Sequence, residues 1–140
     1  MEVKIAKTDE QQQDAYRVRH TVFVLEQNVP PEIEIDELEN DSTHFIGYDG
    51  NQPIAAGRLR YVEDYGKLER VCVLKDFRGL QFGKQMIAEM ENVIRSKGLP
   101  KAKLNAQTHA EDFYKSIGYQ TISEQFMDAG IPHVTMIKEV

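Results

Sequence analysis

The amino-acid sequence predicts a single α/β domain in which a mixed, mostly antiparallel sheet of about seven strands is flanked by helices. Three observations predict this fold class. Short apolar or alternating segments recur between turn residues, and two longer segments repeat apolar residues at the helical period. The chain has 140 residues, 41% of them hydrophobic and 29% charged, which suits one globular unit with one core. We therefore treat residues 1–140 as one domain.

The chain begins with a predicted strand and a long predicted helix. Residues 2–7 alternate polar and apolar side chains, as a strand does. Asp9 is the expected N-cap of a helix that runs to about Gln27, where Pro30 and Pro31 follow. The apolar face of this helix is expected to consist of residues three or four apart, namely Ala15, Val18, Val22 and Leu25.

An acidic segment, residues 32–41, follows the two prolines and is expected to form a loop or a short helical turn. Two interpretations of its carboxylates are open. They attract a cationic amine, such as an amino sugar, a polyamine or a lysine side chain, or they belong to a solvated loop. Arg58 and Arg60 either pair with these acids or bind an anionic group of a ligand.

Strands dominate the middle of the chain. Residues 43–49 and 53–62 are predicted to form a hairpin, because the DGNQ junction between them has the composition of a tight turn. A third strand, residues 67–74, follows the turn sequence DYG. Strands joined by short turns pair antiparallel, which accounts for the antiparallel part of the predicted sheet.

Helices and strands alternate in the C-terminal half. The predicted elements are a helix at 82–97, a strand at 101–107, a helix at 108–117, and strands at about 119–127 and 132–138. Gly98 and Pro100 end the first helix, and Thr108 and Glu111 have the spacing of a capping box for the second. The connection through the first helix should be right-handed, which makes the strands on either side of it parallel.

Composition and charge exclude several functions. The formal net charge of −6, from 17 basic and 23 acidic side chains, argues against nucleic-acid binding, which usually needs a basic surface. No apolar run approaches the roughly 18 residues of a membrane span, and the N-terminus lacks the apolar stretch of a signal peptide. The single cysteine cannot form an internal disulfide. We therefore expect a cytoplasmic protein with neither a membrane nor a nucleic acid as its partner.

The segment most indicative of chemistry is residues 71–87, where an apolar strand, a short basic turn and an amphipathic helix follow one another. Such a turn directs backbone N–H groups and the positive end of the helix dipole toward one point, and Lys75, Arg78 and Lys84 add charge there. The pattern predicts a phosphate or pyrophosphate site. Its spacing matches neither GxxxxGK[ST] nor GxGxxG, which argues against a triphosphatase or a dinucleotide dehydrogenase. The alternative is a basic turn whose glycines serve only its geometry.

The order of elements, the RGLQFG turn and the later FYKSIGY segment resemble the Gcn5-related N-acetyltransferases, the GNAT superfamily, over essentially the whole chain. These enzymes transfer an acetyl group from acetyl-coenzyme A to an amine. Their signature is Q/R-x-x-G-x-G/A; Arg78 and Gly83 match its first and last positions, and Gln81 replaces its middle glycine. The segments VRHTVFVLEQNVP, LNAQTHAEDFY and GIPHVTM are similar to a small bacterial branch of the superfamily.

This resemblance implies a coenzyme A site on three segments. The pyrophosphate turn comprises Arg78, Gly79, Leu80, Gln81, Phe82, Gly83 and Lys84. The pantetheine arm is implied to pair with the backbone of the segment Val71, Cys72 and Val73, with Asn105 on the neighbouring strand. The Cys72 side chain itself is expected to be a buried structural thiol. Coenzyme A binding is expected to survive the replacement by Gln81, with an altered affinity.

The resemblance also implies an acid for the departing thiolate. Tyr114 occupies the position of the GNAT tyrosine, and a phenol of pKa about 10 is a plausible proton donor to a thiolate whose thiol has a pKa of about 8.5. Phe113, which precedes it, either contacts coenzyme A or packs in the core.

The general base for the amine is an open choice. Glu69 is the first candidate, because it lies two and four residues before Val71 and Val73 and some GNAT members place a catalytic glutamate on this strand. The other titratable candidates are His44, His109, His133 and Glu26, and ordered water can also take the proton. The histidines show no metal-ligand spacing, so no metal site is expected.

The predicted function is transfer of an acetyl group from acetyl-coenzyme A to a primary amine of a small molecule by direct attack. Two alternatives are a non-catalytic module that binds acyl-coenzyme A and a protein-lysine acetyltransferase. The expected partner is the small-molecule acceptor, and the chain is either a monomer or a homodimer.

Overall fold

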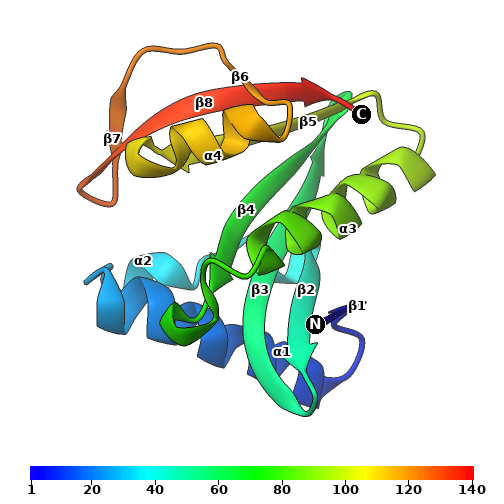
Figure 1. Cartoon of the computed structure of the whole chain (residues 1–140), viewed down its shortest axis with the longest axis vertical. Coiled ribbons are helices and arrows are strands. Elements are labelled where there is room, and N and C mark those ends of the chain that lie inside the picture. The colour runs from blue at the N-terminus through cyan, green and yellow to red at the C-terminus, as the bar shows by residue number, and fades with distance from the viewer.

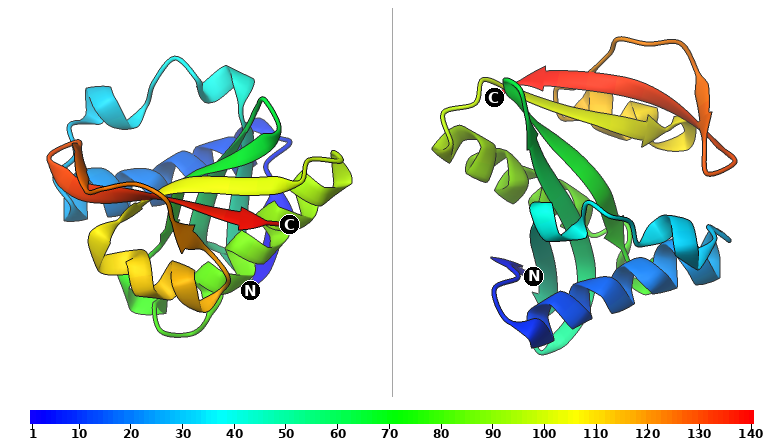
Figure 2. Two further views of the ribbon diagram at one scale, coloured as in Figure 1. Left: turned by 90° about the horizontal axis from the view of Figure 1, so that it is seen from above. Right: turned by 180° about the vertical axis from the view of Figure 1, so that it is seen from behind.

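The computed structural model describes all 140 residues as one twisted sheet with helices on both faces (Figures 1 and 2). The sheet order is β1-β2-β3-β4-β5-β8-β6, and β7 also pairs with β8. All pairs are antiparallel except β4 with β5. The strands are Glu2–Ile5 (β1), Thr43–Asp49 (β2), Gln52–Val62 (β3), Tyr65–Val73 (β4), Lys101–Gln107 (β5), Gln120–Thr121 (β6), Phe126–Asp128 (β7) and Ile131–Glu139 (β8). The predicted fold class is confirmed.

The helices are α1 (Asp9–Arg19), α2 (Pro31–Glu34), α3 (Phe82–Ser96) and α4 (Glu111–Ser116), and none of them is long and apolar enough to span a membrane.

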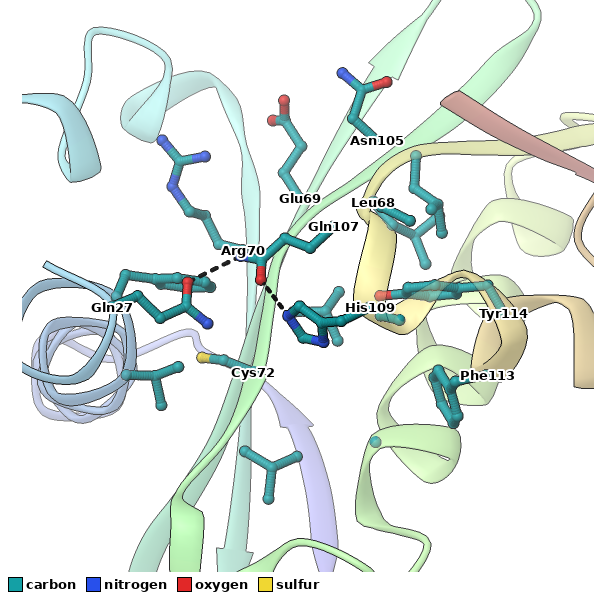
Figure 3. A pocket seen from close by; sticks show the side chains of 18 of the residues that line it. Gln27, Leu68, Glu69, Arg70, Cys72, Asn105, Gln107, His109, Phe113 and Tyr114 are labelled. Atoms are coloured by element: carbon teal, nitrogen blue, oxygen red, sulfur yellow. Dashed lines mark hydrogen bonds between the residues drawn. The ribbon is translucent and has the colours of Figure 1, made fainter. Parts of the chain in front are cut away.

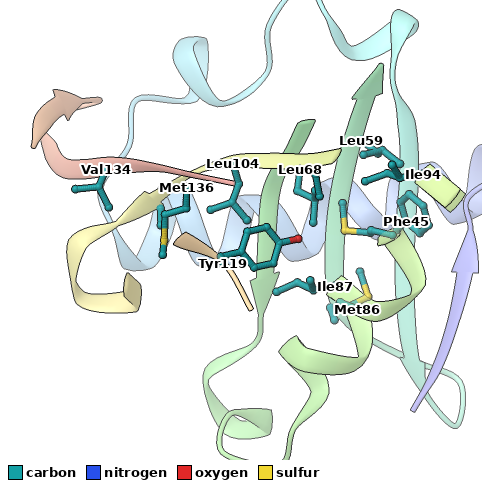
Figure 4. Close-up of a cluster of buried hydrophobic side chains, with 14 of the residues drawn as sticks. Phe45, Leu59, Leu68, Met86, Ile87, Ile94, Leu104, Tyr119, Val134 and Met136 are labelled. Atoms are coloured by element: carbon teal, nitrogen blue, oxygen red, sulfur yellow. The ribbon is translucent and has the colours of Figure 1, made fainter. Parts of the chain in front are cut away.

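Alternation of side chains along the central strands divides the interior into two clusters. Phe45 of β2 packs with Met86 of α3 on one face (Figure 4), whereas Ile46, the next residue, packs with Val18 of α1 on the other. Helices α3 and α1 therefore lie on opposite faces of the sheet.

The N-cap of α1 differs from its prediction. Thr8 rather than Asp9 is the cap, because the Thr8 hydroxyl accepts a hydrogen bond from the Gln11 N–H at 3.1 Å. The Gln11 side chain in turn accepts from the Thr8 N–H at 3.2 Å, which completes a capping box. Asp9 is instead the first helical residue, where its charge favours the helix dipole.

The helix predicted to reach Gln27 changes its winding after Arg19. A π-helical segment, η1 (His20–Glu26), follows, and the Gln27 N–H closes it by donating to the Val22 carbonyl at 3.1 Å. The wider turn alters the angular spacing of the side chains. Leu25, predicted on the apolar face, is therefore 66% exposed, whereas Val22 stays buried.

The predicted strand at 119–127 is wrong, because the chain divides there into β6 and β7. Between them, the Ser123 hydroxyl accepts the Thr135 N–H of β8 at 2.8 Å. A side-chain oxygen thus takes the place that a backbone carbonyl would occupy in a continuous ladder.

The capping box predicted at Thr108 and Glu111 is also absent. Thr108 begins a 3₁₀ turn, η4 (Thr108–Ala110), and gives no side-chain cap to α4. The Glu111 carboxylate instead accepts a hydrogen bond from the Thr121 hydroxyl of β6. A tertiary contact therefore replaces the local one that the spacing predicted.

Strands β4 and β5 pair only over their first residues. The parallel ladder joins Tyr65–Leu68 to Lys101–Leu104 and stops, after which β4 follows β3 and β5 follows β8 (Figure 1). A bulge accompanies the split, because Gly57 of β3 faces two residues of β4, Arg70 and Val71. Arg70 has the left-handed φ of 55°. Past this point, the main-chain N–H and C=O groups on the facing edges of β4 and β5 are not hydrogen-bonded to the opposite strand.

Buried ion pairs fix the acidic segment against α1. The Arg19 side chain is fully buried, and its guanidinium donates to the carboxylates of Glu34 and Glu39, each at 2.8 Å. Both carboxylates are buried as well. These acids of the 32–41 segment therefore neither form a solvated loop nor remain free to attract a cation.

The same network continues onto the sheet. Arg58 of β3, also buried, donates to Asp36 at 2.7 Å and to Glu69 of β4 at 2.9 Å. Arg70 at the bulge donates to Glu34 at 3.0 Å. Of the two interpretations of Arg58, pairing with the acidic segment is the correct one, and the network ties that segment to the strand that splits.

Arg19→Met is expected to lower the free energy of unfolding by about 3–5 kcal/mol, because Glu34 and Glu39 would lose their buried counter-charge. Urea unfolding followed by circular dichroism measures the change. Arg17→Met is the control, since the Arg17 side chain is 69% exposed and its loss should cost less than about 1 kcal/mol. Equal effects of the two substitutions would contradict the role given to the buried network.

Candidate active site

A cavity of about 1100 Å³ opens where β4 and β5 diverge (Figure 3). Its walls come from η1, from the free ends of β4 and β5, from the turn before α3 and from α4, with the start of β8 at its rim. Most of the predicted site residues line it, namely Glu69, Val71, Cys72, Val73, Arg78, Gly79, Gln81, Phe82, Gly83, Lys84, Asn105, Phe113 and Tyr114. Leu80 does not line it, and its side chain is 55% exposed. The split in the sheet therefore gathers residues that are distant in sequence.

The backbone of the turn before α3 is open to the cavity at Gly79. Gly79 has a φ of 79°, and no atom lies within 4 Å of the position that a Cβ would take there. Gln81, which replaces the middle glycine of the signature, adopts the left-handed φ of 69° and offers no side-chain cap to α3. The first N–H groups of α3 therefore lack a side-chain partner, and the backbone keeps the conformation that a glycine would favour.

Arg78 of this turn bridges to η1. Its guanidinium donates to both carboxylate oxygens of Glu26, at 2.6 and 2.7 Å, and its Nε donates to the Val73 carbonyl at 2.9 Å. The hydrogen bonds from Arg78 hold the pKa of Glu26 below its ordinary value. The carboxylate of Glu26 thus neutralises one of the positive charges at the turn.

Tyr114 lies at the opposite wall, on α4. Its ring makes edge contacts with Phe113 and Tyr119, at centroid distances of 5.1 and 5.7 Å. Burial raises the pKa of its phenol to about 12, and no protein group hydrogen-bonds the hydroxyl. Phe113 is 40% exposed and lies against Gly83, whose Cβ would stand 3.8 Å from the ring. The Tyr114 hydroxyl is therefore a protonated donor that is free to serve a ligand.

Glu69 and Cys72 of β4 are both strongly influenced by their surroundings. Burial opposes ionisation of Glu69, but hydrogen bonds from Arg60 and the charges of Arg58 and Lys67 outweigh it and keep its pKa below the ordinary value. One Glu69 oxygen accepts from both arginines, at 2.9 and 2.8 Å. Burial raises the pKa of the Cys72 thiol to about 12, which makes it an inert part of the core.

A chain of polar side chains crosses the cavity (Figure 3). The Gln107 side chain of β5 donates to Gln27, at the end of η1, at 2.8 Å, and its oxygen lies 2.6 Å from His109 Nε2. Asn105 of β5 accepts from Thr135 of β8 at 2.9 Å. Neither Gln27 nor Gln107 was singled out from the sequence, because single glutamines without a motif carry no signal until the fold brings them together.

Two of the predicted base candidates have contrasting positions. His44 lies outside the cavity beside Tyr16 of α1, and its Nδ1 is buried without a partner. His133, at the start of β8, lines the cavity and is only 9% exposed. No cluster of three or more His, Cys, Asp or Glu side chains is arranged to hold a metal ion.

The fold and this cavity define an acyltransferase, and comparisons with known proteins agree. Residues 6–140 match the family model described as acetyltransferase (GNAT) domain. The chain is 51% identical over 140 residues to the uncharacterized N-acetyltransferase YjcF of Bacillus subtilis (strain 168), a match that covers 99% of this chain and 100% of that protein. The chain belongs to the GNAT acetyltransferase family.

Solved structures of other proteins share this architecture. The chain is 32% identical over 129 residues to protein ElaA of Escherichia coli (strain K12), covering 89% of this chain and 84% of ElaA. The crystal structure of ElaA aligns with a TM-score of 0.86 at 27% identity over 99% of both chains. An aminoglycoside 6'-N-acetyltransferase solved with coenzyme A shares the fold at a TM-score of 0.79 and 13% identity, over 99% of this chain and 97% of that one.

Gln81→Gly is expected to raise the free energy of unfolding by up to about 1 kcal/mol. Glycine avoids the left-handed penalty of about 1–2 kcal/mol, and the greater freedom of the unfolded chain offsets part of this gain. Leu80→Gly is the control. Leu80 has no positive φ, so glycine there should lower the free energy of unfolding by about 0.5–1 kcal/mol. Urea unfolding measures both values, and a lower free energy of unfolding for Gln81→Gly would show that the Gln81 side chain itself supports the turn.

Proposed function

We propose that this enzyme transfers an acetyl group from acetyl-coenzyme A to a primary amine of a small molecule by direct attack. The observation that carries the proposal is the continuity of one cavity, from the turn before α3, through the split between β4 and β5, to the polar ends of β5 and β8. A volume of about 1100 Å³ has room for a pantetheine arm, its acyl group and a small acceptor together.

The cofactor end of the cavity fits a pyrophosphate. The residues that would hold it are those of the turn, Arg78, Gly79, Leu80, Gln81, Phe82, Gly83 and Lys84. Their backbone is open at Gly79, and α3 contributes uncapped N–H groups at its first turn. The unpaired edge of Val71–Val73, with Asn105 on the facing strand, would bind the amide groups of the pantetheine arm. Phe113, packed on Gly83, would border that arm.

The chemistry follows from which groups line the split. Acetyl-coenzyme A supplies the thioester that the amine attacks. Backbone N–H groups on the edge of Val71–Val73 that β5 leaves unpaired would stabilise negative charge on the carbonyl oxygen. The Tyr114 hydroxyl would donate its proton to the departing thiolate; burial raises its pKa to about 12, which keeps it protonated at neutral pH and makes it a weaker acid than an ordinary phenol.

Arginines hold two of the carboxylates that line the acceptor end of the cavity. Glu34 pairs with Arg19 and Arg70, and Glu69 pairs with Arg58 and Arg60. Opposite charges that are paired at 2.8–3.0 Å largely cancel at a distance. Asp128 of β7 is then the one lining carboxylate without a charged partner, which supports a small acceptor with a single amino group over a polyamine.

Calorimetric titration with acetyl-coenzyme A tests the cofactor end. Arg78→Ala should weaken binding by about tenfold, the loss of one charge-assisted contact to phosphate. Glu26→Gln is the matched variant and should leave binding equal or tighter, because it removes the carboxylate that neutralises Arg78. No detectable binding by the wild-type protein would show that Gln81 closes the site and would overturn the proposed function.

Tyr114→Phe is expected to lower kcat by about 10²-fold or more and to leave the affinity for acetyl-coenzyme A almost unchanged, because only the proton donor is lost. Thiol release in a screen of primary amines measures kcat, and calorimetry measures the affinity. Tyr61→Phe is the control, because it removes the hydroxyl of an exposed tyrosine of β3 that lies outside the cavity. A Tyr114→Phe variant that binds acetyl-coenzyme A normally and has the wild-type kcat would show that another group protonates the thiolate.

A further inference from the structure

The two faces of β5 and β8 have different chemistry. Val134 and Met136 of β8 are buried in the cluster that contains α3 side chains. Successive residues of a strand point to opposite faces, so His133 and Thr135 face the other side of the sheet. Their register partners on β5 are Gln107 and Asn105, and Thr135 donates to Asn105 at 2.9 Å. A polar surface therefore covers the face of β5 and β8 that is turned away from α3.

His133 has a defined proton arrangement on this surface. Its Nδ1 lies 2.7 Å from the Ile131 carbonyl oxygen, which can only accept, so Nδ1 carries a proton. In the neutral ring the lone pair is then on Nε2, for which the protein provides no hydrogen-bond partner. Phe126 stacks on the ring with centroids 6.0 Å apart and planes 24° from parallel. The ring is thus held in place on the wall of the cavity, and its Nε2 has no protein partner.

From this geometry we propose that His133 accepts the proton of the attacking amine. This inference rests on the proposed function and identifies the base that the sequence left open. As the bond from the amine nitrogen to the thioester carbon forms, Nε2 of His133 takes one proton from that nitrogen. The carbon–sulfur bond breaks, and the sulfur takes the proton of the Tyr114 hydroxyl. The imidazolium and the phenolate that remain return to their starting states by exchanging a proton through solvent.

The division of acid and base between two sides of the split favours this assignment. Tyr114 belongs to α4, whose residues pack on the cluster that contains α3, whereas His133 lies on the opposite face. The base that takes the proton of the amine and the acid that protonates the departing sulfur must approach the same carbonyl carbon from different directions. The cavity that opens between β4 and β5 is lined by both Tyr114 and His133.

The other candidates are occupied elsewhere. The Glu69 carboxylate accepts from Arg58 and Arg60, which lowers its pKa and makes it a weak base. Glu26 is held by Arg78 at the cofactor turn, and His44 lies outside the cavity. His109 donates through Nε2 to Gln107, which leaves its Nδ1 free, but it sits on the turn that leads into α4, on the side of the leaving group.

The test compares His133→Asn with His20→Asn. Asparagine keeps an N–H that can donate to the Ile131 carbonyl and removes the part of the ring that carries Nε2, together with the stacking on Phe126. His20 is exposed on η1, outside the cavity, and serves as the matched control. The probe reaction is thiol release from acetyl-coenzyme A with benzylamine as the acceptor.

We expect His133→Asn to lower kcat by about 10²-fold or more, with the KM for acetyl-coenzyme A changed by less than about twofold, and His20→Asn to match the wild type. Added imidazole should restore turnover to His133→Ala, which a merely structural role would not allow. A His133→Asn variant as active as the wild type would overturn the inference and leave the proposed function standing. A wild-type protein that binds acetyl-coenzyme A and releases no thiol with any primary amine of the screen would overturn the proposed function, and the inference with it.

A second measurement is independent of any acceptor. Nitrogen NMR of the histidine rings at neutral pH should show His133 with its proton on Nδ1 and a bare Nε2. The opposite tautomer would overturn the inference, because it would leave no lone pair on Nε2.

Discussion

The rest of the molecule depends on the point at which β4 and β5 stop sharing hydrogen bonds. Had the ladder continued past Leu68 and Leu104, the edges that form the cavity would have satisfied each other and closed it. The bulge at Arg70 turns β4 away, and Gly57 opposite it allows α3 to pack closely, since a Cβ there would stand 2.9 Å from Met90 Sδ. A local irregularity of one strand thus creates the space in which the chemistry takes place.

Two kinds of interaction hold the walls of this space apart. Below the split, α3 fills one face with apolar side chains such as Met86, Met90 and Ile94. Beside it, buried arginines fasten the acidic segment to β3 and β4. Buried ion pairs contribute less to stability than to position, because the desolvation of the charges offsets much of their attraction. The arginine network therefore serves mainly to fix the position of this wall of the cavity.

The sequence predicted features that depend on neighbouring residues and missed those that depend on distant ones. The strands at 43–49 and 101–107 have their predicted bounds, because alternation and turn residues are local signals. The division of the strand at 119–127 and the absent cap at Thr108 both accompany tertiary hydrogen bonds, and no local sequence signal marks the π-helical winding of η1. The same holds for the site. The glycine-containing turn and Tyr114 carry a motif, whereas the link between Gln27 and Gln107 joins residues 80 positions apart.

The burial of Cys72 has a practical consequence for this enzyme. The only thiol of the chain is 6% exposed among the side chains beneath α1, and burial keeps it protonated at any physiological pH. Peroxide, alkylating reagents and disulfide exchange all require an accessible thiolate. Reagents that modify or oxidise thiols should therefore leave Cys72 of the folded protein intact and should not join two copies of the chain through a disulfide.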